Sequence, residues 1–287
     1  MMKTIFCLLV FFFGLMIGDV ANSFSISPGK ILLTIDPGSS KTVAINIKNT
    51  ENQDLYFVGK VLGVRQDNNG RPVFLSNYIA AESWVVPQSK ILIKKDATDN
   101  FIFTLSVPKN TPAGSYFLGL AIAQDLFSSG VGLTGQIVSI LNLQISGDVS
   151  EELVINKWDF NKAKSNSNHF IFDLNLDNKS KVEVDLTGEI IVYNWRNNVA
   201  AGGPEYLGNT MLPNTGRFLK PQVKMDNNFR FSPYYTAKIN IKYGRLGLLI
   251  SSEAVILNWK VIGVGLGLFL FIILGGILLI KTRKKRV

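Results

Sequence analysis

The sequence predicts an all-β protein with two tandem antiparallel β-sandwiches, followed by one C-terminal transmembrane α-helix. Three observations carry this prediction. Apolar residues recur at every second position through residues 24–257, and no stretch there shows helical periodicity. Gly, Pro, Asn and Asp interrupt these runs at short intervals, as in antiparallel sheets. Finally, Val261–Ile280 is twenty residues without a polar side chain, enough for about 30 Å of helix.

The first 23 residues read as a cleaved signal peptide. Lys3 precedes a mostly apolar run from Ile5 to Ile17, and Ala21-Asn22-Ser23 places small residues before a cut at Phe24. As a helix this run would span about 20 Å, short of the roughly 30 Å hydrocarbon core. An uncleaved N-terminal anchor is the alternative.

Residues 24–147 predict the first sandwich, with a turn at Asp36-Pro37-Gly38, a long strand over Leu55–Gln66 and a last strand over Ile137–Ile145. Residues 148–258 repeat the plan. Alternation from Phe170 to Leu176 opens this second half, residues 197–216 are expected to be rich in loops, and a final strand covers Ala254–Leu257.

One feature occurs in both halves. Pro112-Ala113-Gly114-Ser115-Tyr116 and Ser232-Pro233-Tyr234-Tyr235 each introduce a penultimate strand, and Tyr116 and Tyr235 share the parity of the inward apolar residues. This arrangement resembles the tyrosine corner of immunoglobulin-like sandwiches. We therefore expect immunoglobulin-like domains with Tyr116, Tyr235 and Trp84 as structural residues. Ordinary strand tyrosines are the alternative.

The C-terminal end predicts membrane topology. Residues 259–280 form the span, with Trp259 and Lys260 at its outer border. Residues 281–287 hold five basic side chains, so the positive-inside rule places this tail in the cytoplasm and residues 24–258 outside the cell. The expected location is a cell membrane, crossed once.

Charge and cysteine content exclude some classes of protein. The formal net charge is +9, but residues 24–260 carry 24 basic and 20 acidic groups, which gives no case for nucleic-acid binding. Cys7, the only cysteine, lies in the signal peptide. The mature chain must therefore fold by core burial without disulfides, which favours a bacterial envelope protein.

The sequence shows no catalytic, metal or cofactor machinery. His169 is the only histidine, and no pair of carboxylates is placed for acid–base chemistry. Gly130–Gly135 matches the G-x-G-x-x-G pattern. A dinucleotide site would need a following helix, whereas the next segment alternates like a strand, so a glycine-rich hairpin is the simpler interpretation.

Leu212-Pro213-Asn214-Thr215-Gly216 matches a cell-wall sorting signal. Sorting requires this motif on a flexible segment just before the span, yet residues 217–260, with several expected strands, intervene. Turn chemistry explains the motif. Whether the motif is ever processed stays open.

Gly263 and Gly267 form a G-x-x-x-G pair in the span. Small residues at this spacing let two helices approach closely, so a homodimer through the helix is one hypothesis. Glycine is also common in membrane spans, so the spacing alone does not decide it.

Several short motifs together resemble the WxL-interacting proteins, two-domain anchored surface proteins of Gram-positive-type bacteria. The first domain is also distantly similar to periplasmic pilus chaperones. The motifs are Ser27-Pro28-Gly29-Lys30, Asp36-Pro37-Gly38-Ser39, Thr42-Val43, Ser83-Trp84-Val85, Val107-Pro108, Pro112–Tyr116, Leu212-Pro213, Arg217, Tyr235-Thr236-Ala237 and Tyr243-Gly244. The resemblance implies binding of peptidoglycan by the first domain and of protein partners by the second, without marking the contact residues.

Three functions are compatible with these observations. The leading hypothesis is a non-enzymatic, anchored surface protein whose sandwiches bind peptidoglycan or surface proteins. The alternative is a chaperone or scaffold that assembles surface polymers or secretion machinery by strand addition at a sheet edge. An anchored hydrolase would need a carboxylate site that the sequence does not show.

Overall fold

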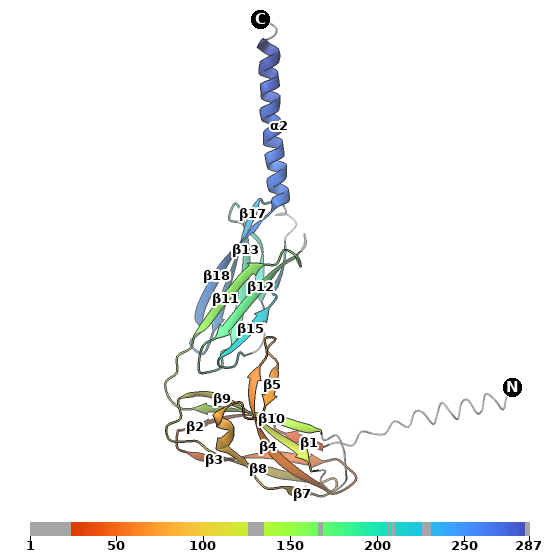
Figure 1. Cartoon of the computed structure of the whole chain (residues 1–287), viewed down its shortest axis with the longest axis vertical. Coiled ribbons are helices and arrows are strands. Elements are labelled where there is room, and N and C mark those ends of the chain that lie inside the picture. The colour runs from red at the N-terminus through yellow and green to blue at the C-terminus, as the bar shows by residue number, and fades with distance from the viewer. Residues whose placement is uncertain are drawn as a thin grey trace, which may run out of the picture. The chain divides into compact units, whose positions relative to one another are not determined.

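The computed structural model describes residues 24–125, 135–165, 169–205, 207, 210–225 and 231–284. These residues form β-strands and one long helix, which confirms the predicted fold class (Figure 1). The chain divides into two compact units. The first comprises 1–63, 75–111 and 116–145, and the second comprises 64–74, 112–115 and 146–287.

The first sandwich consists of two sheets. In one sheet the strand order is β1 (Phe24–Ser27), β3 (Ser40–Asn49), β8 (Thr98–Ser106) and β6 (Val85–Pro87). In the other it is β2 (Lys30–Ile35), β10 (Gln136–Ile145), β9 (Gly114–Gln124), β4 (Leu55–Gln66) and β5 (Pro72–Leu75), with β7 (Ile91–Ile93) also paired to β4. A short 3-10 helix, η1 (Ala80–Trp84), precedes β6.

The alternation seen in the sequence explains the first core. Ile45, Phe101, Phe103, Leu118 and Leu141 are fully buried. In β3 and β8 the residues between the buried ones are more exposed, whereas β9 is buried on both faces along most of its length. The turn predicted at Asp36-Pro37-Gly38 is present: the Ser39 N–H donates to the Asp36 carbonyl at 3.2 Å, and Gly38 has φ +80°, a conformation that suits glycine.

The second sandwich also has two sheets. In one, β12 (His169–Asn178) lies between β11 (Leu153–Phe160) and β15 (Thr215–Leu219), and β16 (Gln222–Lys224) pairs with β12 as well. In the other, the order is β14 (Val199–Glu205), β13 (Leu186–Asn194), β17 (Tyr234–Tyr243) and β18 (Leu248–Leu257). The core includes Phe172, Ile190, Ala237 and Ile239, all fully buried.

Each sandwich has a buried asparagine at the end of one strand. Asn49 ends β3 and Asn178 ends β12, and both side chains are almost fully buried. The Asn49 side-chain amide donates to the carbonyls of Gln53, Ile93 and Lys94 at 2.9–3.2 Å. That of Asn178 donates to Val182, Met211 and Leu212 at 3.0–3.2 Å. Each also accepts a backbone N–H two residues later. In both sandwiches the buried amide therefore joins the end of its strand to a carbonyl four residues later and to two consecutive carbonyls of a distant segment.

Some elements differ from the expectation. β2 and β10 pair in parallel, within sheets expected to be antiparallel. β11 was not expected, β14 lies inside the stretch expected to be loops, and β18 begins at Leu248 rather than Ala254. Ser251, Ser252 and Glu253 pair with β17 like the rest of β18, but three polar residues in a row do not show the alternation that predicts a strand.

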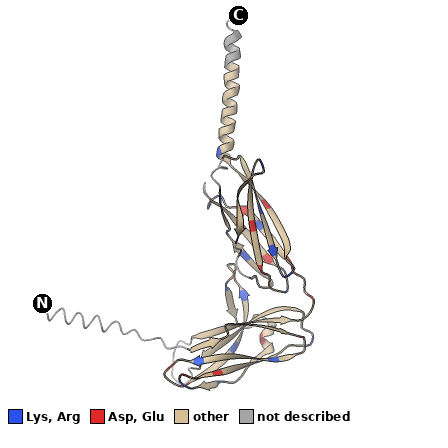
Figure 2. Ribbon diagram, turned by 180° about the vertical axis from the view of Figure 1, so that it is seen from behind, with Lys and Arg blue, Asp and Glu red and all other residues tan. Residues whose placement is uncertain are grey.

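The helix α2 (Trp259–Lys284) follows β18 after the single residue Asn258. Its stretch from Trp259 to Ile277 has a mean hydropathy of 2.3 and is not buried against the sandwich. In Figure 2 the ribbon of α2 is blue at its start and tan along the coloured stretch that follows. By length and composition this helix is able to cross a bilayer.

Candidate binding surfaces

Tyr116 and Trp84 pack together in the first sandwich. Their ring centroids are 4.9 Å apart, and both side chains lie against the first core. Burial raises the pKa of the Tyr116 hydroxyl above 10.0 because the phenolate would lose its hydration.

Tyr235 lies in the second core, 2% exposed and 5.2 Å from the Phe170 ring. Burial raises the pKa of its hydroxyl above 10.0, while hydrogen bonds with the Ser232 backbone and the Asn258 side chain act in the opposite direction. The hydroxyl therefore interacts with the chain three residues upstream.

The remaining sequence motifs fall in different places. Thr215 and Gly216 lie in β15, paired with Asn178 and Asp177 of β12. The sorting-like motif is therefore part of the folded sandwich. His169 begins β12, opposite Lys224. Of the glycine-rich motif, residues 130–134 lie outside the described residues. Gly263 and Gly267 lie in α2, and a Cβ built on either meets no atom within 4 Å.

The clearest open strand edge lies on β10. Strand β2 pairs only with the second half of β10, Ile140–Ile145. The segment before β2 belongs to the opposite sheet, where β1 pairs with β3. Ser139 is also covered, since it is buried and its hydroxyl donates to the Pro28 carbonyl at 2.7 Å, and β1 runs near β10. Gln136–Val138 therefore extend beyond the end of β2. Ile137 is 36% exposed, with the parity of buried Leu141 and Leu143.

The backbone direction along this edge follows from one hydrogen bond. The Ile140 N–H donates to the Gly29 carbonyl at 2.9 Å, so even-numbered residues of β10 direct their N–H and C=O groups to the β2 side. Val138 therefore presents both groups toward the open edge. An extended segment laid beside Gln136–Val138 would continue the position of β2.

The last strand of the second sandwich, β18, forms a longer edge. It pairs with β17 over all ten residues and is terminal in its sheet. The Asn258 N–H donates to the Pro233 carbonyl at 2.9 Å, so Val255, of opposite parity, directs its backbone groups away from β17. The strand β11 of the other sheet runs close beside β18, however. This edge has less room for an added strand.

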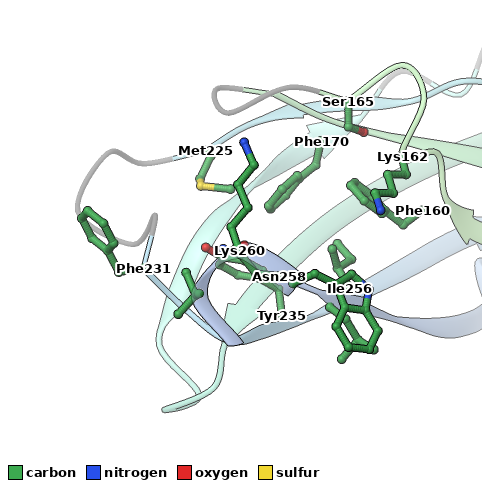
Figure 3. A pocket seen from close by; sticks show the side chains of 13 residues that line it. Phe160, Lys162, Ser165, Phe170, Met225, Phe231, Tyr235, Ile256, Asn258 and Lys260 are labelled. Atoms are coloured by element: carbon green, nitrogen blue, oxygen red, sulfur yellow. The ribbon is translucent and has the colours of Figure 1, made fainter. Parts of the chain in front are cut away.

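A cavity of about 540 Å³ lies where the second sandwich meets α2 (Figure 3). Aromatic and aliphatic side chains from β11, β12, β17 and β18 line it, together with the first residues of the helix. The charged lining residues are Lys162 and Lys260. Within the described residues, no group of three or more His, Cys, Asp and Glu side chains is placed to hold a metal ion.

No protein-family model matches the chain, and no curated protein matches it in sequence. In fold, the chain is similar to the class 5 fimbriae chaperone CfaA, with a TM-score of 0.47 and 13% identity over 82% of this chain and 100% of CfaA. It is also similar to the Csu pilus chaperone–tip adhesion subunit complex of Acinetobacter baumannii (TM-score 0.40, 15% identity, 81% and 98% covered).

The E. coli chaperone DraB gives a TM-score of 0.38 and 10% identity over 81% of this chain and 98% of DraB.

Proposed function

We propose that this protein is a non-enzymatic, membrane-anchored chaperone or scaffold of the cell envelope, which holds extended segments of partner proteins by strand addition. The observation that carries the proposal is the open half of β10. There the Val138 N–H and C=O face outward and the exposed Ile137 supplies apolar contact. Backbone hydrogen bonds give affinity in strand addition, and alternate side chains give specificity.

The anchor in this proposal is α2. Its 26 residues span about 39 Å, and Trp259 and Lys260 at its start suit a membrane interface. With the basic residues after Ile280 in the cytoplasm, both sandwiches would lie outside the cell. Alkaline carbonate should leave the full chain in the membrane fraction, and protease added to intact cells should remove the sandwiches. Release by carbonate would refute the anchor.

The strand-addition test uses the full chain in lipid nanodiscs and a photo-crosslinking residue at exposed Gln136. We expect crosslinks to secreted or envelope proteins, and we expect Val138→Pro to reduce them by up to about tenfold, since it removes one edge donor. Val255→Pro is the matched control, because it removes an edge-facing N–H from β18. Equal loss from both variants, or from neither, would contradict the assignment to β10.

Peptidoglycan binding and the resemblance to WxL-interacting proteins stay proposals of their own. Pull-down of the same nanodiscs on purified cell wall tests the first. If the cell wall retains the protein, and Val138→Pro does not change this retention, the protein has a second binding surface. That result would favour the leading hypothesis from the sequence.

The homodimer through the helix also stays a prediction. Gly263 and Gly267 are four residues apart and have open space around them, as a close helix contact requires. Changing both to Ile should convert a dimer to a monomer in detergent. An oligomeric state that does not change would remove this hypothesis.

A further inference from the structure

The cavity at the start of α2 belongs to neither the β10 edge nor the span itself. Its walls come from the two sheets of the second sandwich and from the first residues of the helix, Trp259, Lys260 and Val261. These residues also begin the proposed span. If α2 crosses the bilayer, the cavity lies at the height of the lipid headgroups.

The lining has the character of an acyl-chain site. Phe170, Tyr235, Ile256 and Met225 are buried side chains that form the wall, and Phe231 is 84% exposed. A volume of about 540 Å³ lies within the range of small-molecule sites, which are mostly apolar with a few placed polar groups. Figure 3 shows Lys162 and Lys260 among these aromatic side chains.

Positive charge gathers beside this apolar lining. Lys162 and Lys260 line the cavity, and Lys164 precedes the lining residue Ser165. The Lys220 amine is close enough to Lys164 to lower the pKa of the Lys164 ammonium group, mainly by hydrogen bonding and like-charge repulsion.

The acids nearby already have partners. The Asp173 carboxylate raises the pKa of Lys164, but this is the smallest of the effects on that pKa. The same carboxylate lies 3.7 Å from the Lys157 amine and accepts a hydrogen bond from the Asn161 side chain. Asp159 lies 3.7 Å from the same Lys157 amine. The cluster around the cavity mouth therefore keeps a positive excess, which complements a phosphate.

A second observation places this end of the sandwich at a membrane surface. Trp195, Tyr234 and Trp259 are 47%, 42% and 62% exposed. The Trp195 backbone N–H donates to the Ser232 hydroxyl at 3.2 Å. The Arg196 guanidinium lies 4.7 Å from the Trp195 ring centroid. Exposed Trp and Tyr with basic neighbours are typical of the headgroup region.

We propose that the cavity binds one anionic phospholipid of the surrounding bilayer, with an acyl chain in the apolar interior and the phosphate at Lys162 and Lys260. The inference rests on the membrane anchoring in the proposed function. Such a lipid would fill the space between sandwich and helix and fix the second domain on the membrane surface.

The test places the full chain in nanodiscs of equal phosphatidylglycerol and phosphatidylcholine, extracts it into mild detergent and identifies retained lipid by native mass spectrometry. We expect one phosphatidylglycerol per chain. The double variant Lys162→Glu and Lys260→Glu should reduce the retention of phosphatidylglycerol by about fivefold or more for each of the two lysines. Both lysines are exposed, so the fold should persist, as thermal unfolding can verify.

Lys242→Glu, at the opposite end of β17, is the matched control and should leave retention unchanged. Equal retention of both lipids, no effect of the double variant, or complete displacement by inorganic phosphate or free palmitate would overturn the proposal. Carbonate extraction of the same preparation separates the two failures: a chain that stays in the membrane but retains no lipid refutes the lipid site alone.

Discussion

Each sandwich has a buried asparagine with a matching set of hydrogen bonds, but the last strands of the two sandwiches have different neighbours. Asn49 and Asn178 make matching sets of bonds at the ends of β3 and β12. In the first sandwich, β10 is covered along half its length by the parallel strand β2. In the second, β11 stays in the sheet with β12 and leaves β18 unpaired on its outer side. The buried asparagine and its hydrogen bonds are thus alike in the two sandwiches, while the edge strands differ.

The largest expected change in the free energy of unfolding concerns the two buried asparagines, which the sandwiches have in common. Asn49→Ala and Asn178→Ala each remove the donors to three carbonyls and the acceptor of one N–H. Unsatisfied buried groups cost about 1–3 kcal/mol each, so with four such groups each variant should lose at least about 4 kcal/mol of unfolding free energy. Hydrogen exchange read by mass spectrometry can follow each sandwich separately. A large loss in one sandwich and none in the other would show that the two asparagines are not equivalent.

The next effect separates the covered half of β10 from the open half. Leu143 is fully buried opposite β2, so Leu143→Ala should cost about 2–5 kcal/mol. Ile137 has the same parity but is partly exposed at the open edge, so Ile137→Ala should cost less than about 1 kcal/mol. Denaturant unfolding measures both. Similar losses would mean that the core continues through the open half.

A smaller effect concerns the two tyrosines, one in each sandwich. Burial raises the pKa of Tyr116 and of Tyr235 above the value of 10.0 expected in the unfolded chain. The folded state therefore binds these protons more tightly, and the resulting stability is complete below about pH 10 and declines as the pH rises above it. Tyr116→Phe and Tyr235→Phe should each reduce this alkaline decline, as unfolding measured from neutral to alkaline pH can show. An unchanged slope in both variants would contradict the burial effect.

The smallest effect concerns the outer face of the β17–β18 pair. Lys238 and Glu253 are cross-strand partners with charged atoms 3.5 Å apart, and both are substantially exposed. Exposed pairs contribute roughly 0–1 kcal/mol, so Glu253→Gln should change the unfolding free energy of the second sandwich by no more than this. A larger loss would show that this pair stabilises the open edge of β18.

The alternation of apolar residues predicted the fold class because every second side chain of a strand faces the core. It could not predict the parallel pairing of β2 with β10, since a strand's periodicity says nothing about its neighbour. β11 escaped detection because a register shift between Ile155 and Lys157 interrupts its alternation. β14 escaped detection because Gly202, Gly203 and Pro204 read as turn residues.

The candidate sites were less predictable than the strands. Ile137 was expected in the last strand of the first sandwich, but its position at an edge depends on where β1 changes to the other sheet. The cavity brings together residues near positions 160, 170, 225, 235 and 256–261. No local sequence pattern connects segments so far apart, so only the folded chain shows them.

The direct passage from β18 into α2 has a mechanical consequence. Only Asn258 separates them, and it joins both elements: its N–H donates to the Pro233 carbonyl, and its carbonyl accepts the Ile262 N–H at 3.1 Å. Tension on the anchor would therefore pull β18 along its own axis. The hydrogen bonds to β17 lie across that axis and are distributed over the ten paired residues of β18. These bonds would therefore resist the load together instead of opening one at a time.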